Sequence, residues 1–128
     1  MLTEKDYCDY DTCVALKELG YPLTSKKVRY EDKAVFVPGV LLYSAQKWLR
    51  EDKGIHIEVY ACAGGYIYEL CKAYKPSSFS GGTTIYTPND VDNPKLNDAG
   101  RYDDFETCLS EGIKEAVKIL KENETIHR

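Results

Sequence analysis

Apolar and polar residues alternate strictly in the middle of the chain, within the segment KGIHIEVYACAGGYIYEL of residues 53–70. The apolar set is Ile55, Ile57, Val59 and Ala61, and the residues between them are His56, Glu58, Tyr60 and Cys62. A period of two is typical of a strand with one buried and one solvated face. Gly64 and Gly65 supply the positive φ angles of a tight turn. Residues 55–61 and 66–73 are therefore predicted to form a hairpin.

The expected pairing of this hairpin keeps apolar residues on one face and polar residues on the other. The predicted pairs are Tyr60–Glu69, Glu58–Cys71, Val59–Leu70 and Ala61–Tyr68. A slip of one residue would move Glu69 into the core, so the face assignment is strongly determined. We expect His56, Glu58 and Glu69 to lie off the core.

Helical spacing of apolar residues predicts two helices before the hairpin. The first opens at Asp9 and stops before Gly20, which suits a helix C-terminus. The second starts within residues 40–44 and ends at Gly54. Trp48 lies on its apolar side, and we expect its truncation to cost about 3–5 kcal/mol if the indole is central in the core.

A third helix is predicted near the end of the chain. Asp103 and Glu106 have the spacing of a capping box, with Asp103 as the N-cap. A stripe of apolar and small residues follows: Phe105, Cys108, Leu109, Gly112, Ile113, Ala116, Val117 and Leu120. Because Gly112 costs about 1 kcal/mol of helix propensity, its place on this stripe indicates a close approach to the sheet.

Shorter elements and loops complete the pattern. Residues 28–37 read as two short strands around residues 31–33, and residues 83–86 read as an edge strand. Residues 74–101 otherwise form a long polar loop, in which 77–101 are rich in Gly, Pro, Ser, Thr, Asn and Asp. Loops of this length are functional or mobile. The 128 residues (1–128) suit a single domain.

The fold class that this pattern favours is α+β, with helices packed on one face of a small antiparallel sheet. The predicted helix–strand–strand–(strand)–helix order of residues 40–121 matches double-stranded-RNA-binding domains in element order only. The formal net charge of −4 and the mixed Glu and Lys residues of the last helix argue against a nucleic-acid partner.

Composition points to a cytoplasmic protein without a membrane span. The first residues, MLTEKDYCDYD, contain no apolar run of a signal peptide, and no stretch approaches ~18 consecutive apolar residues. The five cysteines are an odd number without a C-x-x-C pair, so we expect reduced thiols and no structural metal. Eleven tyrosines against three phenylalanines suit a half-solvated sheet or an interaction surface, although a core preference explains them almost as well.

The runs AQKWLREDKGIHIEV (45–59) and YDDFETCLSEGIKEAVKIL (102–120) resemble a family of small uncharacterised proteins of gut Bacteroidetes and of their phages and prophages. The segment YCDYDTCVALKELGYP is similar as well, so the resemblance covers most of the chain except residues 74–101. Cys108 stands where the family pattern has alanine. Because the family carries no assigned activity, the resemblance implies a phage or mobile-element setting and no catalytic residues.

The candidate binding residues lie on the polar side of the predicted hairpin: His56, Glu58, Tyr60, Ile67 and Cys71. Strand alternation puts His56 and Glu58 about 7 Å apart on one face, which permits acid–base chemistry. A nucleophilic thiol would need a nearby base, and Cys71 is expected diagonally across from His56. A solvated strand explains these residue types better, because no serine or oxyanion donor can be assigned beside His56. We assign no catalytic residues and no metal or cofactor.

Two functions are consistent with these observations. The first is a non-catalytic protein that binds an unknown host or phage protein, or a second copy of itself, through the uncovered sheet face. The alternative is a small-ligand-binding protein or enzyme that uses the same face with residues 77–101 as a lid. Stabilisation by one ligand in a thermal-shift screen would favour the alternative.

Overall fold

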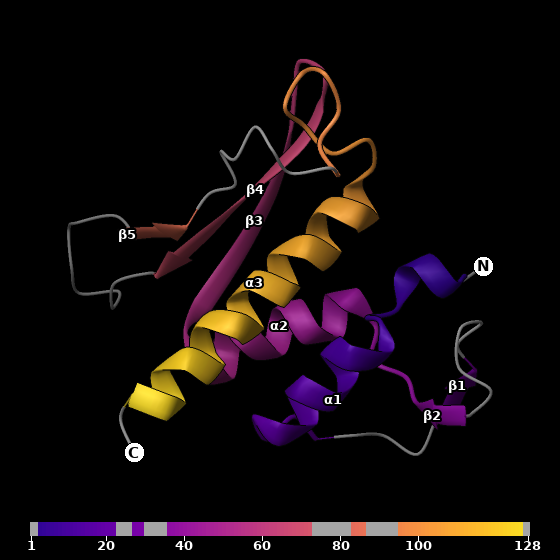
Figure 1. Cartoon of the computed structure of the whole chain (residues 1–128), viewed down its shortest axis with the longest axis vertical. Coiled ribbons are helices and arrows are strands. Elements are labelled where there is room, and N and C mark those ends of the chain that lie inside the picture. Colours follow the sequence, from indigo (N-terminus) through magenta and orange to yellow (C-terminus); the bar gives the residue numbers. More distant parts are fainter. Residues whose placement is uncertain (1–2, 23–26, 30–35, 73–82, 87–94, 127–128) are drawn as a thin grey trace.

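The computed structural model describes residues 3–22, 27–29, 36–72, 83–86 and 95–126 (Figure 1). In chain order the elements are η1 (Glu4–Asp6), α1 (Tyr10–Glu18), β1 (Lys27–Arg29), β2 (Phe36–Pro38), α2 (Leu42–Lys53), β3 (Ile55–Cys62), β4 (Gly65–Lys72), β5 (Thr83–Tyr86) and α3 (Phe105–Ile126). The predicted hairpin, edge strand and three helices are all present. The turn predicted at residues 31–33, and much of the predicted polar loop, lie outside the described residues.

The fold is α+β, as the sequence predicted. β3, β4 and β5 form an antiparallel sheet in that order, and β1 pairs with β2 separately. The side chains that β3 and β4 bury all belong to one face: Ile55, Ile57, Tyr68 and Leu70. α3 contacts both strands and runs along the hairpin, whereas α2 contacts β3 (Figure 1). We call this covered side the inner face and the opposite side the outer face.

The predicted faces of the hairpin are confirmed, but the predicted register is wrong by two residues. Cys62 pairs with Gly65, Tyr60 with Ile67 and Glu58 with Glu69. A shift of two preserves alternation, so every side chain keeps its predicted face. Ile57 is 2% exposed, whereas His56, Glu58 and Glu69 lie on the outer face.

The error in register arose because only one of the two glycines belongs to the turn. Ala63 and Gly64 form the two-residue connection, and Gly64 has a φ of 93°. Gly65 is instead the first residue of β4. A Cβ atom on Gly65 would lie 2.3 Å from the backbone O of Tyr102, which shows that glycine is needed there for close backbone packing. That contact is between residues far apart in the sequence.

The first two helices follow the predicted boundaries closely. Asp9 caps α1 by accepting a hydrogen bond from the backbone N of Thr12 at 2.8 Å, and Gly20 follows the helix with a φ of 103°. Gly54 ends α2 in the left-handed conformation. Trp48 is only partly buried and meets the ring of Tyr21 edge-on, with centroids 5.4 Å apart. The centre of the α2 stripe is formed by residues of zero exposure: Leu42, Ala45 and Leu49.

α3 begins one residue later than the sequence predicted. Asp104, not Asp103, is the N-cap, because its Oδ1 accepts a hydrogen bond from the backbone N of Thr107 at 2.7 Å. The carboxylate of Asp103 instead accepts a hydrogen bond from the side-chain amide of Asn97 at 2.8 Å. The residues that α3 buries are those of the predicted stripe: Cys108, Leu109, Gly112, Ile113, Ala116 and Val117.

Gly112 lets α3 approach the sheet closely, as predicted. A Cβ atom at this position would lie 2.8 Å from Cγ2 of Ile57 and 3.3 Å from Cγ of Tyr68. Both neighbours are buried, so neither can easily move away. The α3–hairpin interface therefore has no space for a methyl group at its centre.

The substitution Gly112→Ala should destabilise the protein although it raises helix propensity. We expect a net loss of about 1–3 kcal/mol from overpacking, because the gain in propensity is only about 1 kcal/mol. Urea unfolding followed by circular dichroism measures the change. Ile57→Ala removes the clashing methyl, so the double variant should lose less stability than the sum of the two single variants. Stabilisation by Gly112→Ala alone would contradict the close approach.

Candidate functional site

All five candidate residues project from the outer face of the β3–β4 hairpin. The outer-face pairs are His56–Cys71, Glu58–Glu69, Tyr60–Ile67 and Cys62–Gly65. Among the described residues, α2 and α3 contact the inner side of these strands. The outer face therefore carries an apolar pair of Tyr60 and Ile67, an acidic pair, and a His–Cys pair in successive rows along the hairpin.

The His–Cys row is closer than the sequence indicated. Cys71 lies directly opposite His56, whereas the predicted register placed it diagonally. The thiol Sγ of Cys71 lies 3.0 Å from Oε1 of Glu69, to which it donates a hydrogen bond. A carboxylate in this position disfavours a negatively charged thiolate. The arrangement therefore opposes a cysteine nucleophile on this face.

The acidic row sets two like charges against each other. Glu58 and Glu69 are directly opposite in the antiparallel ladder, where Cβ atoms are about 5 Å apart. This row makes the middle of the outer face acidic. Glu69 was absent from the predicted site set, although alternation from Ile67 and Cys71 would have found it.

Tyr60 is the most exposed large apolar residue of the hairpin, at 45%. Partial desolvation raises the pKa of its hydroxyl, and the negative charge of Glu69 adds to this, whereas the positive charge of Arg101 lowers the pKa. Arg101 lies beside Gly65, since a Cβ atom there would come within 3.1 Å of the Arg101 Cβ. The guanidinium group thus borders the outer face at the turn end of the hairpin.

The position of Arg101 depends on a loop that binds the hairpin turn. The side-chain amide of Asn97 donates to the backbone O of Gly64 at 2.9 Å, and its Oδ1 accepts from the backbone N of Arg101 at 3.2 Å. Tyr66 and Tyr102 exchange two backbone hydrogen bonds of 2.9 Å. Sequence alone gave no signal for this contact, because the two segments are far apart in the chain and neither belongs to a recognisable motif.

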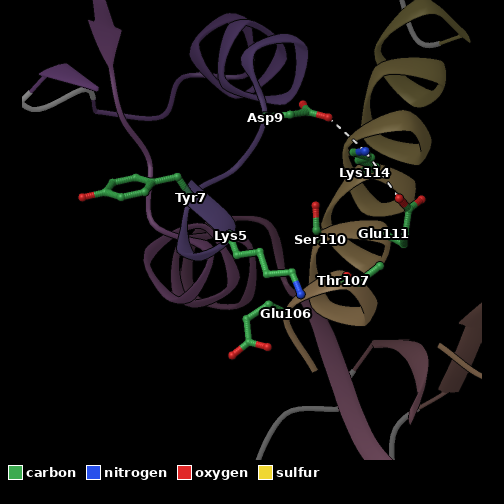
Figure 2. A pocket seen from close by; sticks show the side chains of 8 residues that line it. All are labelled: Lys5, Tyr7, Asp9, Glu106, Thr107, Ser110, Glu111 and Lys114. Carbon is green, nitrogen blue, oxygen red and sulfur yellow. Dashed lines mark hydrogen bonds and ion pairs between the residues drawn. The ribbon is translucent and has the colours of Figure 1, made fainter. Parts of the chain in front are cut away.

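A pocket of about 160 Å³ lies between η1, the residues after it, and α3 (Figure 2). Its lining residues are Lys5, Tyr7, Asp9, Glu106, Thr107, Ser110, Glu111 and Lys114. Figure 2 shows Lys114 between the carboxylates of Asp9 and Glu111, with Nζ–O distances of 2.9 and 3.4 Å. Lys5 bonds Asp104 at 2.6 Å. Both lysines of the pocket therefore already have carboxylate partners. We call these ion pairs of Lys5 and Lys114 the clamp.

The electrostatics of the clamp agree with this interpretation. The hydrogen bond from Lys5, with that from Thr107, lowers the pKa of Asp104 to about 2. Burial opposes protonation of Lys114, but its bonds to Asp9 and Glu111 raise its pKa overall. These shifts favour the charged forms of both partners. The clamp therefore fixes the N-terminal segment to α3.

The thiols and the helices show little sign of other chemistry. None of the five cysteines forms a disulfide, and burial raises the pKa of Cys108 to about 12 and also raises that of Cys8. Over the described ranges, no cluster of three His, Cys, Asp or Glu side chains could hold a metal ion. In the same part of the chain, no helix is long and apolar enough to span a membrane.

Comparison with known proteins adds no assignment, since no family model, no curated protein and no solved structure matches this chain.

Replacing Asp104 by Asn should weaken the clamp at neutral pH while keeping a good helix cap. Because the folded pKa of about 2 lies below the ordinary value of 3.8, the charged form stabilises the fold above about pH 4. That contribution is lost as the pH falls through 2. We expect Asp104→Asn to cost about 0.5–1 kcal/mol at pH 7 and nearly nothing at pH 2.

Urea unfolding at several pH values tests this expectation, with Asp98→Asn as the matched control. Asp98 is exposed and forms none of the clamp's ion pairs. A loss of stability for Asp104→Asn that did not change with pH would contradict the ion-pair mechanism.

The cysteines should fall into two classes of reactivity. Cys62 and Cys71 are only partly buried, whereas Cys8, Cys13 and Cys108 are 5% exposed or less. Thiol titration of the folded protein should label the first two before the three buried ones, and unfolding should bring the total to five. Fast labelling of Cys108 in the folded state, with Cys71 protected, would contradict this division.

Proposed function

We propose that this protein is a non-catalytic binding protein that docks another protein on the outer face of the β3–β4–β5 sheet. The observation that carries the proposal is the composition of this face. Tyr60 and Ile67 form an apolar row that borders the acidic row of Glu58 and Glu69. Tyrosine exposed beside an aliphatic residue is typical of interaction surfaces.

The acidic row indicates the chemistry of the partner. The two carboxylates make this row of the outer face acidic. A lysine or arginine of the partner would complement this charge, and an apolar neighbour of that residue would cover Tyr60 and Ile67. We therefore propose a partner segment that presents a basic residue next to an apolar one.

The biological setting is proposed from other features of the chain. The resemblance of residues 45–59 and 102–120 to the phage-associated family supports a host or phage protein as the partner. Five free cysteines fit a reducing compartment, which favours the cytoplasm. The unfavourable environment of Cys71 supports a role without covalent chemistry.

The test is capture of a partner from the native host by the immobilised chain and by outer-face variants. Glu58→Gln with Glu69→Gln removes the charge of this row without changing the shape of its side chains, and circular dichroism checks that the variant folds. We expect this variant to lose most of the captured partner, since a buried charge pair that loses one side costs ~2–5 kcal/mol. The variant Ile67→Lys should also lose most of the captured partner.

The matched control is Val14→Glu, because Val14 is 42% exposed on α1 and remote from the hairpin. It should capture the partner as well as the natural chain does. A partner retained by both outer-face variants, or lost with Val14→Glu, would refute docking on this face. Failure to capture any protein from the host would refute the proposed function.

A further inference from the structure

Within the described residues, the edge of the sheet formed by β3 is long and pairs with no further strand. β3 is the outer strand of the order β3-β4-β5, and its eight residues pair with β4 without a bulge. It contains neither proline nor lysine, two residues that commonly keep edge strands from pairing with other chains. The opposite edge strand, β5, has only four residues.

Hydrogen bonds show which backbone groups of β3 point away from β4. Gln46 of α2 donates from Nε2 to the backbone O of Ile57 at 2.8 Å, so this carbonyl lies outside the ladder. Tyr66, which lies opposite Ala61, uses its N–H and C=O to bond Tyr102 on the other side of β4. Tyr66 and Ala61 are therefore a non-hydrogen-bonded pair, and the N–H and C=O of Ala61 point outward.

Every second residue of a strand directs its N–H and C=O to the same side, so those of Val59 point outward like those of Ala61. Neither Val59 nor Ala61 has a hydrogen bond outside the β3–β4 ladder within the described part of the chain. Ala61 is exposed and Val59 is half-buried. The hairpin extends well past α2 toward its turn, so α2 leaves this half of β3 uncovered (Figure 1). Two N–H and two C=O groups are thus available.

We propose that this half of β3 pairs with the same segment of a second copy of the chain, antiparallel, about a two-fold axis at Tyr60. In this register Val59 faces Ala61 of the second copy, and Ala61 faces its Val59. The four available groups of each copy then form four hydrogen bonds across the interface. Tyr60 faces its own counterpart at a non-hydrogen-bonded site, where opposing side chains are closest.

The neighbouring registers are less favourable. An axis at Glu58 would set two glutamates opposite each other. An axis at Val59 would place Ala61 against Ile57, whose carbonyl already accepts the hydrogen bond from Gln46. An axis at Ala61 would set Val59 against the turn residue Ala63. Only the Tyr60 axis uses all the available groups and brings two exposed aromatic rings together.

A second copy suits this edge because the edge is self-complementary. Two donors and two acceptors match the same set after a two-fold rotation, as an isologous interface requires. The pairing joins two three-stranded sheets into one sheet of six strands. It goes beyond the proposed function and does not depend on it, because the outer-face side chains other than Tyr60 are left free.

The experiment measures the mass of the protein in solution by sedimentation, over a range of concentrations. We expect the 14.5 kDa chain to form a dimer. Ala61→Pro should abolish the dimer but not the fold, because proline is tolerated where an edge N–H faces solvent. The two hydrogen bonds lost per dimer should weaken association at least about 30-fold. Circular dichroism checks the fold.

Tyr60→Glu is the second variant and decides the matter if Ala61→Pro does not fold. It sets two carboxylates opposite each other at the axis and removes the aromatic pair, so we expect association to weaken at least about tenfold. Val14→Glu makes the same change of charge at a similarly exposed site and should dimerise like the natural chain.

The register is tested by oxidising Tyr60→Cys and mapping the cross-link. Residues at a non-hydrogen-bonded pair have Cα atoms about 4.5 Å apart, within the range of a disulfide. We expect a dimer linked between positions 60 of the two copies. A natural chain that stays monomeric up to about 1 mM, undiminished dimers of both edge variants, or a link at other positions would each overturn the proposal.

The same variants separate this proposal from the proposed function. Ala61→Pro leaves Glu58, Ile67 and Glu69 unchanged, so a monomeric variant can still be tested for capture of a partner. Capture that survives the loss of the dimer supports independent surfaces. Glu58→Gln with Glu69→Gln should conversely leave the dimer intact, and a dimer lost with these changes would overturn the Tyr60-centred register.

Discussion

The close contact of α3 with the β3–β4 hairpin at Gly112 determines the rest of the structure. The missing side chain lets the helix backbone approach Ile57 and Tyr68, so the inner face is packed without a gap. Because strand side chains alternate, this contact also decides which residues are left outside. The candidate binding surface is therefore a consequence of how the core is packed.

The sequence predicted the faces of the hairpin better than its register, and the reason is physical. The face of a strand residue depends only on whether its number is odd or even. The alternation of Ile55, Ile57 and Val59 was therefore sufficient to assign the two faces. Register depends on the turn, and two adjacent glycines allowed two solutions. The choice between them is made by Tyr102, whose backbone requires a glycine at position 65. No local pattern contains that information.

The same division applies to the candidate site and to the cap of α3. Alternation brought His56, Glu58 and Cys71 to one face and would also have included Glu69. Arg101 could not have been found, because its place beside the hairpin follows from hydrogen bonds between segments distant in the chain. By sequence, Asp103 was the preferred cap because Glu106 stands three residues after it. In the structure, Asp103 bonds Asn97 and Asp104 caps the helix.

Two treatments of charge coexist in this small protein. At the N-terminal clamp, Lys5 and Lys114 neutralise carboxylates that approach α3, which is the arrangement expected where stability alone matters. On the outer face, the hairpin instead sets Glu58 opposite Glu69. A sequence that departs from a favourable local pairing tends to do so at a functional position. The edge strand β3 also departs from the usual pattern, because it has neither the proline nor the lysine that commonly blocks strand addition. Both features lie on one hairpin, which packs against α3, and this is where we propose that the protein binds its partners.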